Sequence, residues 1–173
     1  MSHGRIIIVT GEVDSGKTSW CRRRVNGTRA AGVLLLKVYR DGGRVGYDAL
    51  HLPGSESVPF ARIDGYQPSG WVESQRVGPF SVCAEGLAAA NAWLHEAAGA
   101  AADIMVDEVG PLELAGKGLS SGVRAVLSAV RERRVYLVVR SGCVEAVRRV
   151  FGITAFEIVD VGEVADESEA RQS

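Results

Sequence analysis

Apolar residues in this chain gather in short runs, separated by stretches rich in alanine, leucine and charged residues. Residues 5–10, 33–39 and 135–139 are almost continuously apolar, which is typical of strands buried on both faces of a parallel sheet. Residues 101–107 contain a shorter apolar run, and residues 156–161 alternate β-branched and aromatic residues with acids. We therefore predict a strand in each of these ranges.

Helical patterns lie between the predicted strands. Residues 84–98 and 119–133 are rich in alanine, leucine, glutamate and arginine, and residues 17–29 and 144–150 are shorter helical segments. Strands that alternate with helices predict an α/β fold, in which a mainly parallel sheet is flanked by helices to give three layers.

The segment from residue 41 to residue 80 interrupts this alternation. Its D-G-G turn at residues 41–43, flanked by the arms 34–39 and 45–52, predicts a β-hairpin. We interpret the segment as an insertion after the second strand, made of short strands and loops over one end of the sheet. A disordered surface loop is the alternative. The segment holds four prolines and several apolar anchors, namely Pro53, Pro59, Pro68, Pro79, Phe60, Ile63, Tyr66, Trp71 and Phe80.

Length and composition favour one folded domain. The chain has 173 residues, of which 46% are hydrophobic, as in a globular chain with a substantial core. We expect a single domain over residues 1–162. Residues 163–173 are acidic and lack large apolar side chains, so we expect this tail to be mobile.

Charge and cysteine content exclude several classes of protein. The 20 basic and 21 acidic residues give a net charge of −1, so nucleic acid and membrane surfaces are not expected partners. Cys21, Cys83 and Cys143 are too widely spaced for a disulfide framework or a zinc site. With no signal peptide and no apolar stretch of the ~20 residues that span a membrane, we expect a cytoplasmic protein.

One motif carries the chemistry. Residues 11–18 read G-E-V-D-S-G-K-T and directly follow the apolar run at residues 6–9, which is the context of a phosphate-binding loop between a strand and a helix. Glycines let such a loop wrap a phosphate chain with its N–H groups pointing inward. The predicted nucleotide-binding residues are Gly11, Glu12, Val13, Asp14, Ser15, Gly16, Lys17, Thr18 and Ser19.

Two side chains of the loop have distinct predicted roles. Lys17 is expected to reach the β- and γ-phosphates as a point charge, and the Thr18 hydroxyl is expected to bind Mg²⁺. A helix that begins near Gly16 adds the positive end of its dipole.

A pair of acids supplies the second half of the predicted site. The run at residues 104–106 ends in Asp107 and Glu108, and Mg²⁺ in such sites is held by a carboxylate at the end of a neighbouring strand. Asp107 is therefore the predicted metal ligand, and Glu108 is the candidate that orients or activates the attacking water. Residues 107–110 also match the D-x-x-G element of GTPases, but the chain lacks an N-K-x-D element, so strict guanine selection is not expected.

Longer motifs resemble a known family. Residues 106–114 (V-D-E-V-G-P-L-E-L) are similar to the D-E-(I/V)-G-x-x-E-L signature of the small phosphate-loop nucleoside triphosphatases first associated with thermophiles, which include a human cancer-related nucleoside triphosphatase. Residues 40–48 resemble that family's R-x-x-G-x-R-x-G-(F/Y) segment, and residues 76–82 resemble its V-G-x-(Y/F)-x-V strand.

The resemblance implies a phosphate-loop NTPase fold and slow, Mg²⁺-dependent hydrolysis of ATP, GTP and other nucleoside triphosphates with little base preference. It places Lys17, Thr18, Asp107 and Glu108 at the phosphate, metal and water positions. Two features depart from the family pattern. Pro111 stands where a longer polar residue is expected, and residues 159–163 lack an Asn-Arg pair near the base.

Arginines supply further candidates. Negative charge spreads over the equatorial oxygens in phosphoryl transfer, and an arginine placed there accelerates the reaction. Arg40 and Arg44 follow the second predicted strand and could reach the phosphates. We take Arg44 as a candidate catalytic residue. A solvated surface position is the alternative for both arginines.

Two other functions fit the same residues. A kinase would pass the γ-phosphoryl group to a small acceptor, with residues 41–79 as lid and acceptor site. A nucleotide-dependent switch or assembly factor would use slow hydrolysis to reset a partner interaction. The sequence identifies no protein partner.

Overall fold

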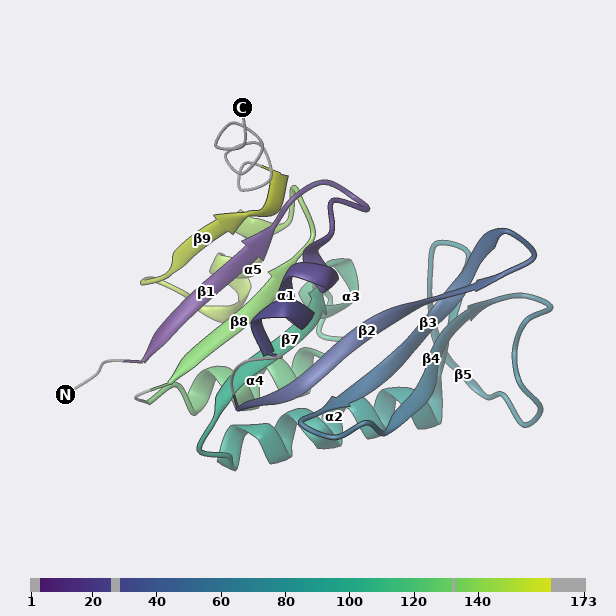
Figure 1. Cartoon of the computed structure of the whole chain (residues 1–173), viewed down its shortest axis with the longest axis horizontal. Helices are drawn as coiled ribbons and strands as arrows, with labels where there is room; N and C mark the ends of the chain where they lie inside the picture. Colours follow the sequence, from purple (N-terminus) through teal and green to yellow (C-terminus); the bar gives the residue numbers. More distant parts are fainter. Residues whose placement is uncertain (1–3, 26–28, 132, 163–173) are drawn as a thin grey trace.

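The computed structural model describes residues 4–25, 29–131 and 133–162. Within these residues, nine strands form one sheet in the order β5-β6-β4-β3-β2-β7-β8-β1-β9 (Figure 1). The strands are β1 (Arg5–Thr10), β2 (Ala30–Arg40), β3 (Gly43–Leu52), β4 (Ser57–Ile63), β5 (Glu73–Val77), β6 (Phe80–Cys83), β7 (Asp103–Val109), β8 (Arg134–Val139) and β9 (Glu157–Asp160). The helices are α1 (Lys17–Val25), α2 (Ala84–Gly99), α3 (Pro111–Leu114), α4 (Ser120–Ser128) and α5 (Val144–Phe151).

The sheet is mixed, so the expectation of a mainly parallel sheet is wrong. Strands β2, β7, β8, β1 and β9 pair in parallel, whereas β2 to β6 pair with one another in antiparallel fashion. The physical reason is the length of the connections. Strands β3 to β6 return through turns and loops without a crossover helix, and a strand that returns in this way runs antiparallel to its partner.

The predicted hairpin is present, but the inserted segment does not lie over the end of the sheet. Strands β2 and β3 pair from Gly32↔Leu52 to Arg40↔Gly43, so the turn falls at Asp41 and Gly42 as expected. Strands β3, β4, β6 and β5 then extend the main sheet at its β2 edge. The segment from residue 41 to residue 80 therefore forms the antiparallel half of the sheet.

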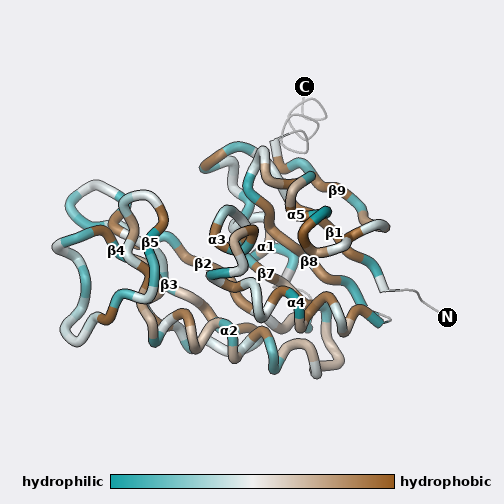
Figure 2. Tube along the Cα trace, turned by 180° about the vertical axis from the view of Figure 1, so that it is seen from behind, coloured by the Kyte–Doolittle hydropathy of each residue, from teal (hydrophilic) through white to brown (hydrophobic). Residues whose placement is uncertain are grey.

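Helices cover the two faces of the sheet unequally. One face packs under α2, α4 and α5 through buried side chains such as Leu94, Val123 and Val147. The other face packs under α1 through Trp20 and Cys21. Figure 2 shows the hydrophobic residues along the central strands and the polar residues at the loops. The predicted three layers are present. Helix α1 lies over β8, and its first turn reaches β7.

A close approach of two strands holds the two halves of the sheet together. Gly32 of β2 pairs with Met105 of β7. Its φ is +123°, and a Cβ at this position would lie 2.0 Å from the Met105 carbonyl oxygen. Only a glycine fits such a backbone contact. The contact joins β2 to the strand that carries Asp107 and Glu108.

Some predicted boundaries shift. The predicted helix at residues 119–133 ends at Ser128, because the chain turns there toward β8. Helix α1 is described as far as Val25, and the acidic tail at residues 163–173 lies outside the described residues. Cys21 and Cys83 are buried free cysteines. In the part of the chain that the structure describes, we find no helix with the length and hydrophobicity of a membrane span.

Candidate functional site

The phosphate-loop motif forms the connection between β1 and α1. Gly11 is buried with φ +151°, and a Cβ there would lie 2.6 Å from Ser15 Oγ, so the turn depends on glycine. Helix α1 begins at Lys17, and the Trp20 N–H donates to the Gly16 carbonyl over 2.8 Å. Because the first N–H groups of a helix lack partners within the helix, this end of α1 offers hydrogen-bond donors to an anion.

Lys17 folds back on its own loop. Its Nζ donates to the carbonyl oxygens of Gly11 and Glu12, each over 2.9 Å. The ammonium group therefore lies at the mouth of the loop, at the start of α1. An ammonium group binds negatively charged phosphate oxygens more strongly than neutral carbonyl oxygens.

Thr18 and Asp107 lie in direct contact, although they are 89 positions apart in sequence. Thr18 Oγ1 donates to Asp107 Oδ2 over 2.7 Å, and the Leu35 N–H donates to the same oxygen over 3.3 Å. Asp107 is only 2% exposed. Burial raises the pKa of Asp107 to about 7, against the opposing effect of the Thr18 hydroxyl. A cation beside this carboxylate favours its ionised form.

The loop and Asp107 do not belong to neighbouring strands, contrary to the prediction. Strand β8 lies between β1 and β7 in the sheet, and Thr18 reaches Asp107 because α1 crosses the face of β8. Strand β8, which separates β1 from β7, also brings a further residue to the site. Arg140 directly follows β8, and its Nε lies 3.4 Å from Glu108 Oε1.

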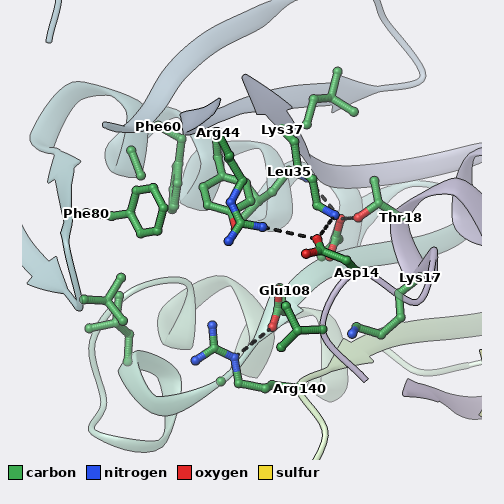
Figure 3. A pocket seen from close by; sticks show the side chains of 18 of the residues that line it. Asp14, Lys17, Thr18, Leu35, Lys37, Arg44, Phe60, Phe80, Glu108 and Arg140 are labelled. Atoms are coloured by element: carbon green, nitrogen blue, oxygen red, sulfur yellow. Dashed lines mark hydrogen bonds and ion pairs between the residues drawn. The ribbon is translucent and has the colours of Figure 1, made fainter. Parts of the chain in front are cut away.

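One cavity of about 470 Å³ joins the predicted site residues (Figure 3). Glu108 lies between the phosphate-loop side chains and an aromatic group that includes Phe60 and Phe80. Glu108 is half-buried. Gly11 and Glu12 belong to the same loop but do not line the cavity. The predicted residues that line it are Val13, Asp14, Ser15, Gly16, Lys17, Thr18, Ser19, Arg44, Asp107 and Glu108.

The two candidate arginines have different positions. Arg44 Nη1 lies 3.3 Å from Asp14 Oδ1 of the phosphate loop. Arg40 is exposed, and its Nη1 donates to the carbonyl of Tyr39 over 2.8 Å. The hairpin therefore brings Arg44 to the site and leaves Arg40 at the surface.

Lys37 is a site residue that the sequence prediction missed. Lys37 lies in β2, and its Nζ forms a hydrogen-bonded ion pair with Asp14 of the phosphate loop. This hydrogen bond lowers the pKa of Asp14, and the charges of Arg44 and Lys17 lower it further by smaller amounts. A signal was available, because Lys37 is the one charged residue in the apolar run at residues 33–39. Arg140 carried a weaker signal as the first polar residue after the strand at 135–139.

Glu113 has a structural environment. Its two carboxylate oxygens accept hydrogen bonds from the N–H groups of Gly110 (2.8 Å) and Leu119 (2.9 Å). The side chain is 6% exposed, and burial raises its pKa. It thereby closes the loop that carries α3. Pro111 is the first residue of α3, where its fixed φ suits the helix and no N–H is needed, which accounts for proline at this position.

We expect Glu113→Gln to lower the free energy of unfolding by about 1 kcal/mol. The amide removes a buried charge, but its NH₂ group leaves one of the two backbone N–H groups without an acceptor. Urea denaturation measures the change. Glu56→Gln, at an exposed position in the loop between β3 and β4, is the matched control and is expected to be neutral. A Glu113→Gln protein as stable as the parent would show that the two hydrogen bonds do not hold the loop.

Sequence comparisons connect this chain to a known family. A model of a family described as NTPase matches residues 6–164. The nucleoside-triphosphatase THEP1 of Methanopyrus kandleri is 27% identical over 128 residues, which cover 71% of this chain and 67% of that protein. The nucleoside-triphosphatase THEP1 of Hyperthermus butylicus is 30% identical over 129 residues, covering 71% and 65%. The match thus spans about two thirds of the length of these relatives.

Solved structures show the same fold. The crystal structure of THEP1 from the hyperthermophile Aquifex aeolicus superposes with a TM-score of 0.70 at 21% identity, covering 96% of this chain and 95% of that one. The solution structure of a human cancer-related nucleoside triphosphatase superposes with a TM-score of 0.64 at 22% identity, covering 97% of each chain. The mixed α/β architecture is therefore shared with these proteins.

Proposed function

The chain belongs to the NTPase family of nucleoside triphosphatases, and we propose that it slowly hydrolyses ATP, GTP and related nucleoside triphosphates to the diphosphate and phosphate with Mg²⁺. The observation that carries the proposal is the 2.7 Å hydrogen bond from Thr18 Oγ1 to Asp107 Oδ2. It joins the phosphate loop to a buried carboxylate beside Glu108. Little base preference is proposed, since the sequence lacks the guanine-reading N-K-x-D element.

The phosphate loop provides the anion site. The free N–H groups at the start of α1 and the Lys17 ammonium group would bind the β- and γ-phosphates. Ser15 supports this role, because its buried hydroxyl has no hydrogen-bond partner among the described residues. A buried hydroxyl without a partner is costly, and a phosphate oxygen would satisfy it.

The donor set at Thr18 and Asp107 fits Mg²⁺. This ion prefers oxygen ligands and is commonly held by one or two protein side chains together with phosphate oxygens and water. The Thr18 hydroxyl and the Asp107 carboxylate offer two such oxygens in contact with each other. When bound, the ion neutralises charge on the β- and γ-phosphate oxygens.

Glu108 is proposed to position the attacking water. Its carboxylate lies in the cavity next to the loop, and Arg140 Nε holds it from the end of β8 over 3.4 Å. A carboxylate there orients the water and accepts its proton as the new bond to phosphorus forms. Lys37 and Arg44 lie near the loop and are proposed to stabilise the charge that develops on the transferred group.

In this proposal, Asp14 competes with the phosphates for the side chains of Lys37 and Arg44. Asp14→Asn is expected to tighten ATP binding about fivefold, because the change frees Lys37 and Arg44 and removes a negative charge near the phosphates. Asparagine tolerates the positive φ of 61° at this position. Titration calorimetry measures the dissociation constant. Asp64→Asn, at an exposed acid paired with Arg76, is the control, and weaker binding in Asp14→Asn would contradict the competition.

Phosphate release tests the proposed activity. The purified protein is incubated with ATP, GTP, CTP or UTP, in Mg²⁺ or in EDTA, and inorganic phosphate is measured. We expect release from all four nucleotides with Mg²⁺ and its loss in EDTA. Release from GTP alone would contradict the broad base preference, whereas unchanged release in EDTA would contradict the proposed metal site.

A further inference from the structure

The cavity extends past the phosphate loop and Glu108. Past Glu108, it continues between the antiparallel strands and α3 (Figure 3). We call this part the apolar chamber. Its walls are Tyr47 of β3, Phe60 of β4, Val77 of β5, Phe80 and Val82 of β6, and Leu112 of α3.

The walls of the apolar chamber are built from the core of the protein. Phe60 and Val82 are 6% and 1% exposed, and the rings of Tyr47 and Phe80 pack edge to face with centroids 5.4 Å apart. Apolar walls around an open space forfeit dispersion contacts and are poor partners for water. An apolar occupant restores those contacts, whereas the hydrolysis of a triphosphate does not require them.

Among the described residues that line the cavity, Glu108, Arg140 and Arg44 lie at the end of the apolar chamber that faces the phosphate loop. Glu108 and Arg140 lie there, and the guanidinium carbon of Arg44 lies 5.5 Å from the centroid of the Tyr47 ring. Glu113 also lines the cavity, but backbone N–H groups occupy both of its carboxylate oxygens. The chamber therefore suits a molecule with an apolar body and one polar end directed toward Glu108.

The size of the space limits the occupant to a small molecule. The whole cavity measures about 470 Å³, and a triphosphate bound at the phosphate loop would fill part of it. Pockets for small ligands span about 300–1,000 Å³ and combine apolar walls with a few placed polar groups. An aromatic ring fits the edge-to-face arrangement of the walls.

We propose that the apolar chamber binds a small aromatic alcohol and that the protein transfers the γ-phosphoryl group to this hydroxyl as well as to water. The inference rests on the proposed triphosphatase function of the same site. The hydroxyl oxygen bonds to the γ-phosphorus, and the bond from that phosphorus to the β–γ bridging oxygen breaks. Its electron pair stays with the departing diphosphate, and the hydroxyl proton passes to the Glu108 carboxylate. The products are a phosphate monoester and a nucleoside diphosphate.

A competition between acceptors tests the proposal. The protein is incubated with ATP labelled at the γ-phosphate, Mg²⁺, and either benzyl alcohol or glycerol at equal concentration, and the labelled products are separated by chromatography. We expect the ratio of monoester to phosphate to be about tenfold higher with benzyl alcohol, because the ring is buried by the chamber walls. Phosphate release without benzyl phosphate would overturn the inference and leave the triphosphatase function intact. Absence of both products would contradict the two together.

A variant locates the acceptor. Val77→Trp fills the apolar chamber from the half-buried end of β5, and we expect it to lower the ratio of benzyl phosphate to phosphate about tenfold. Val72→Trp, at a position that is 64% exposed, is the control and is expected to keep the parent ratio. An unchanged ratio in a folded Val77→Trp protein would place the acceptor elsewhere and overturn the inference. The comparison of the two alcohols on the parent protein decides the question if this variant does not fold.

Discussion

Replacing Lys17 by alanine is expected to weaken the binding of Mg²⁺ and ATP about 100-fold. The Lys17 ammonium group lies 2.9 Å from the carbonyl oxygens of Gly11 and Glu12, within reach of any phosphate in the loop. Two hydrogen bonds between charged groups contribute about 3 kcal/mol to binding, which corresponds to a factor of about 100 in the dissociation constant. Titration calorimetry measures that constant, and the rate of phosphate release should fall with it at subsaturating ATP.

A second lysine provides the control. Lys117 is exposed in the turn between α3 and α4, so Lys117→Ala changes the net charge equally and is expected to bind ATP as the parent does. Urea denaturation of both variants separates a loss of binding from a loss of folding. Unchanged ATP affinity in folded Lys17→Ala would remove the phosphate loop from the proposed mechanism.

The parallel half of the fold could be predicted because its signals are local. Strands β1 and β8 are continuous apolar runs, and each needs helices on both of its faces, which fixes its place inside the sheet. Apart from the D-G-G turn of the β2–β3 hairpin, the antiparallel half gives no such signal. Strand β3 contains two glycines and strand β4 contains Pro59, and the pairing of β3 to β6 depends on contacts between distant residues such as Ala61 and Val82. Local patterns do not encode these contacts.

The residues of the candidate site also differ in how far local sequence patterns could predict them. Thr18 and Asp107 could be proposed from local patterns, because Thr18 belongs to the loop motif after β1 and Asp107 follows the apolar run at residues 104–106. The structure places their side-chain oxygens 2.7 Å apart. Lys37 and Arg140 escaped prediction because their roles depend on strand order. Lys37 reaches Asp14 only because β2 lies beside β7, and Arg140 reaches Glu108 only because β8 lies between β7 and β1.

The antiparallel half also contributes residues to the candidate site. It carries Arg44, whose guanidinium group lies 3.3 Å from Asp14, and it supplies most walls of the apolar chamber. The parallel half carries the phosphate loop and the two acids. The segment from residue 41 to residue 80 lacks a regular hydrophobic pattern, yet it has a defined structure, because aromatic side chains such as Phe60 and Phe80 pack against the core.

Glu108→Gln is expected to slow phosphate release about 1,000-fold while ATP affinity stays close to that of the parent. Glutamine keeps the shape of the side chain and an oxygen for Arg140, which lies 3.4 Å away, but it accepts no proton. General-base catalysis contributes about 100- to 10,000-fold to such reactions. Single-turnover measurements at saturating ATP isolate the chemical step from product release.

The combination of retained affinity and lost turnover is what distinguishes a group that acts on the attacking water from one that binds the nucleotide. Glu85→Gln, at an exposed position on α2, makes the same chemical change far from the cavity and should leave both quantities unchanged. If Glu108→Gln bound ATP poorly, the carboxylate would instead support the phosphates or the metal ion. If it turned over as fast as the parent, the water would be activated without Glu108, and the position of this carboxylate between the phosphate loop and the apolar chamber would have no catalytic meaning.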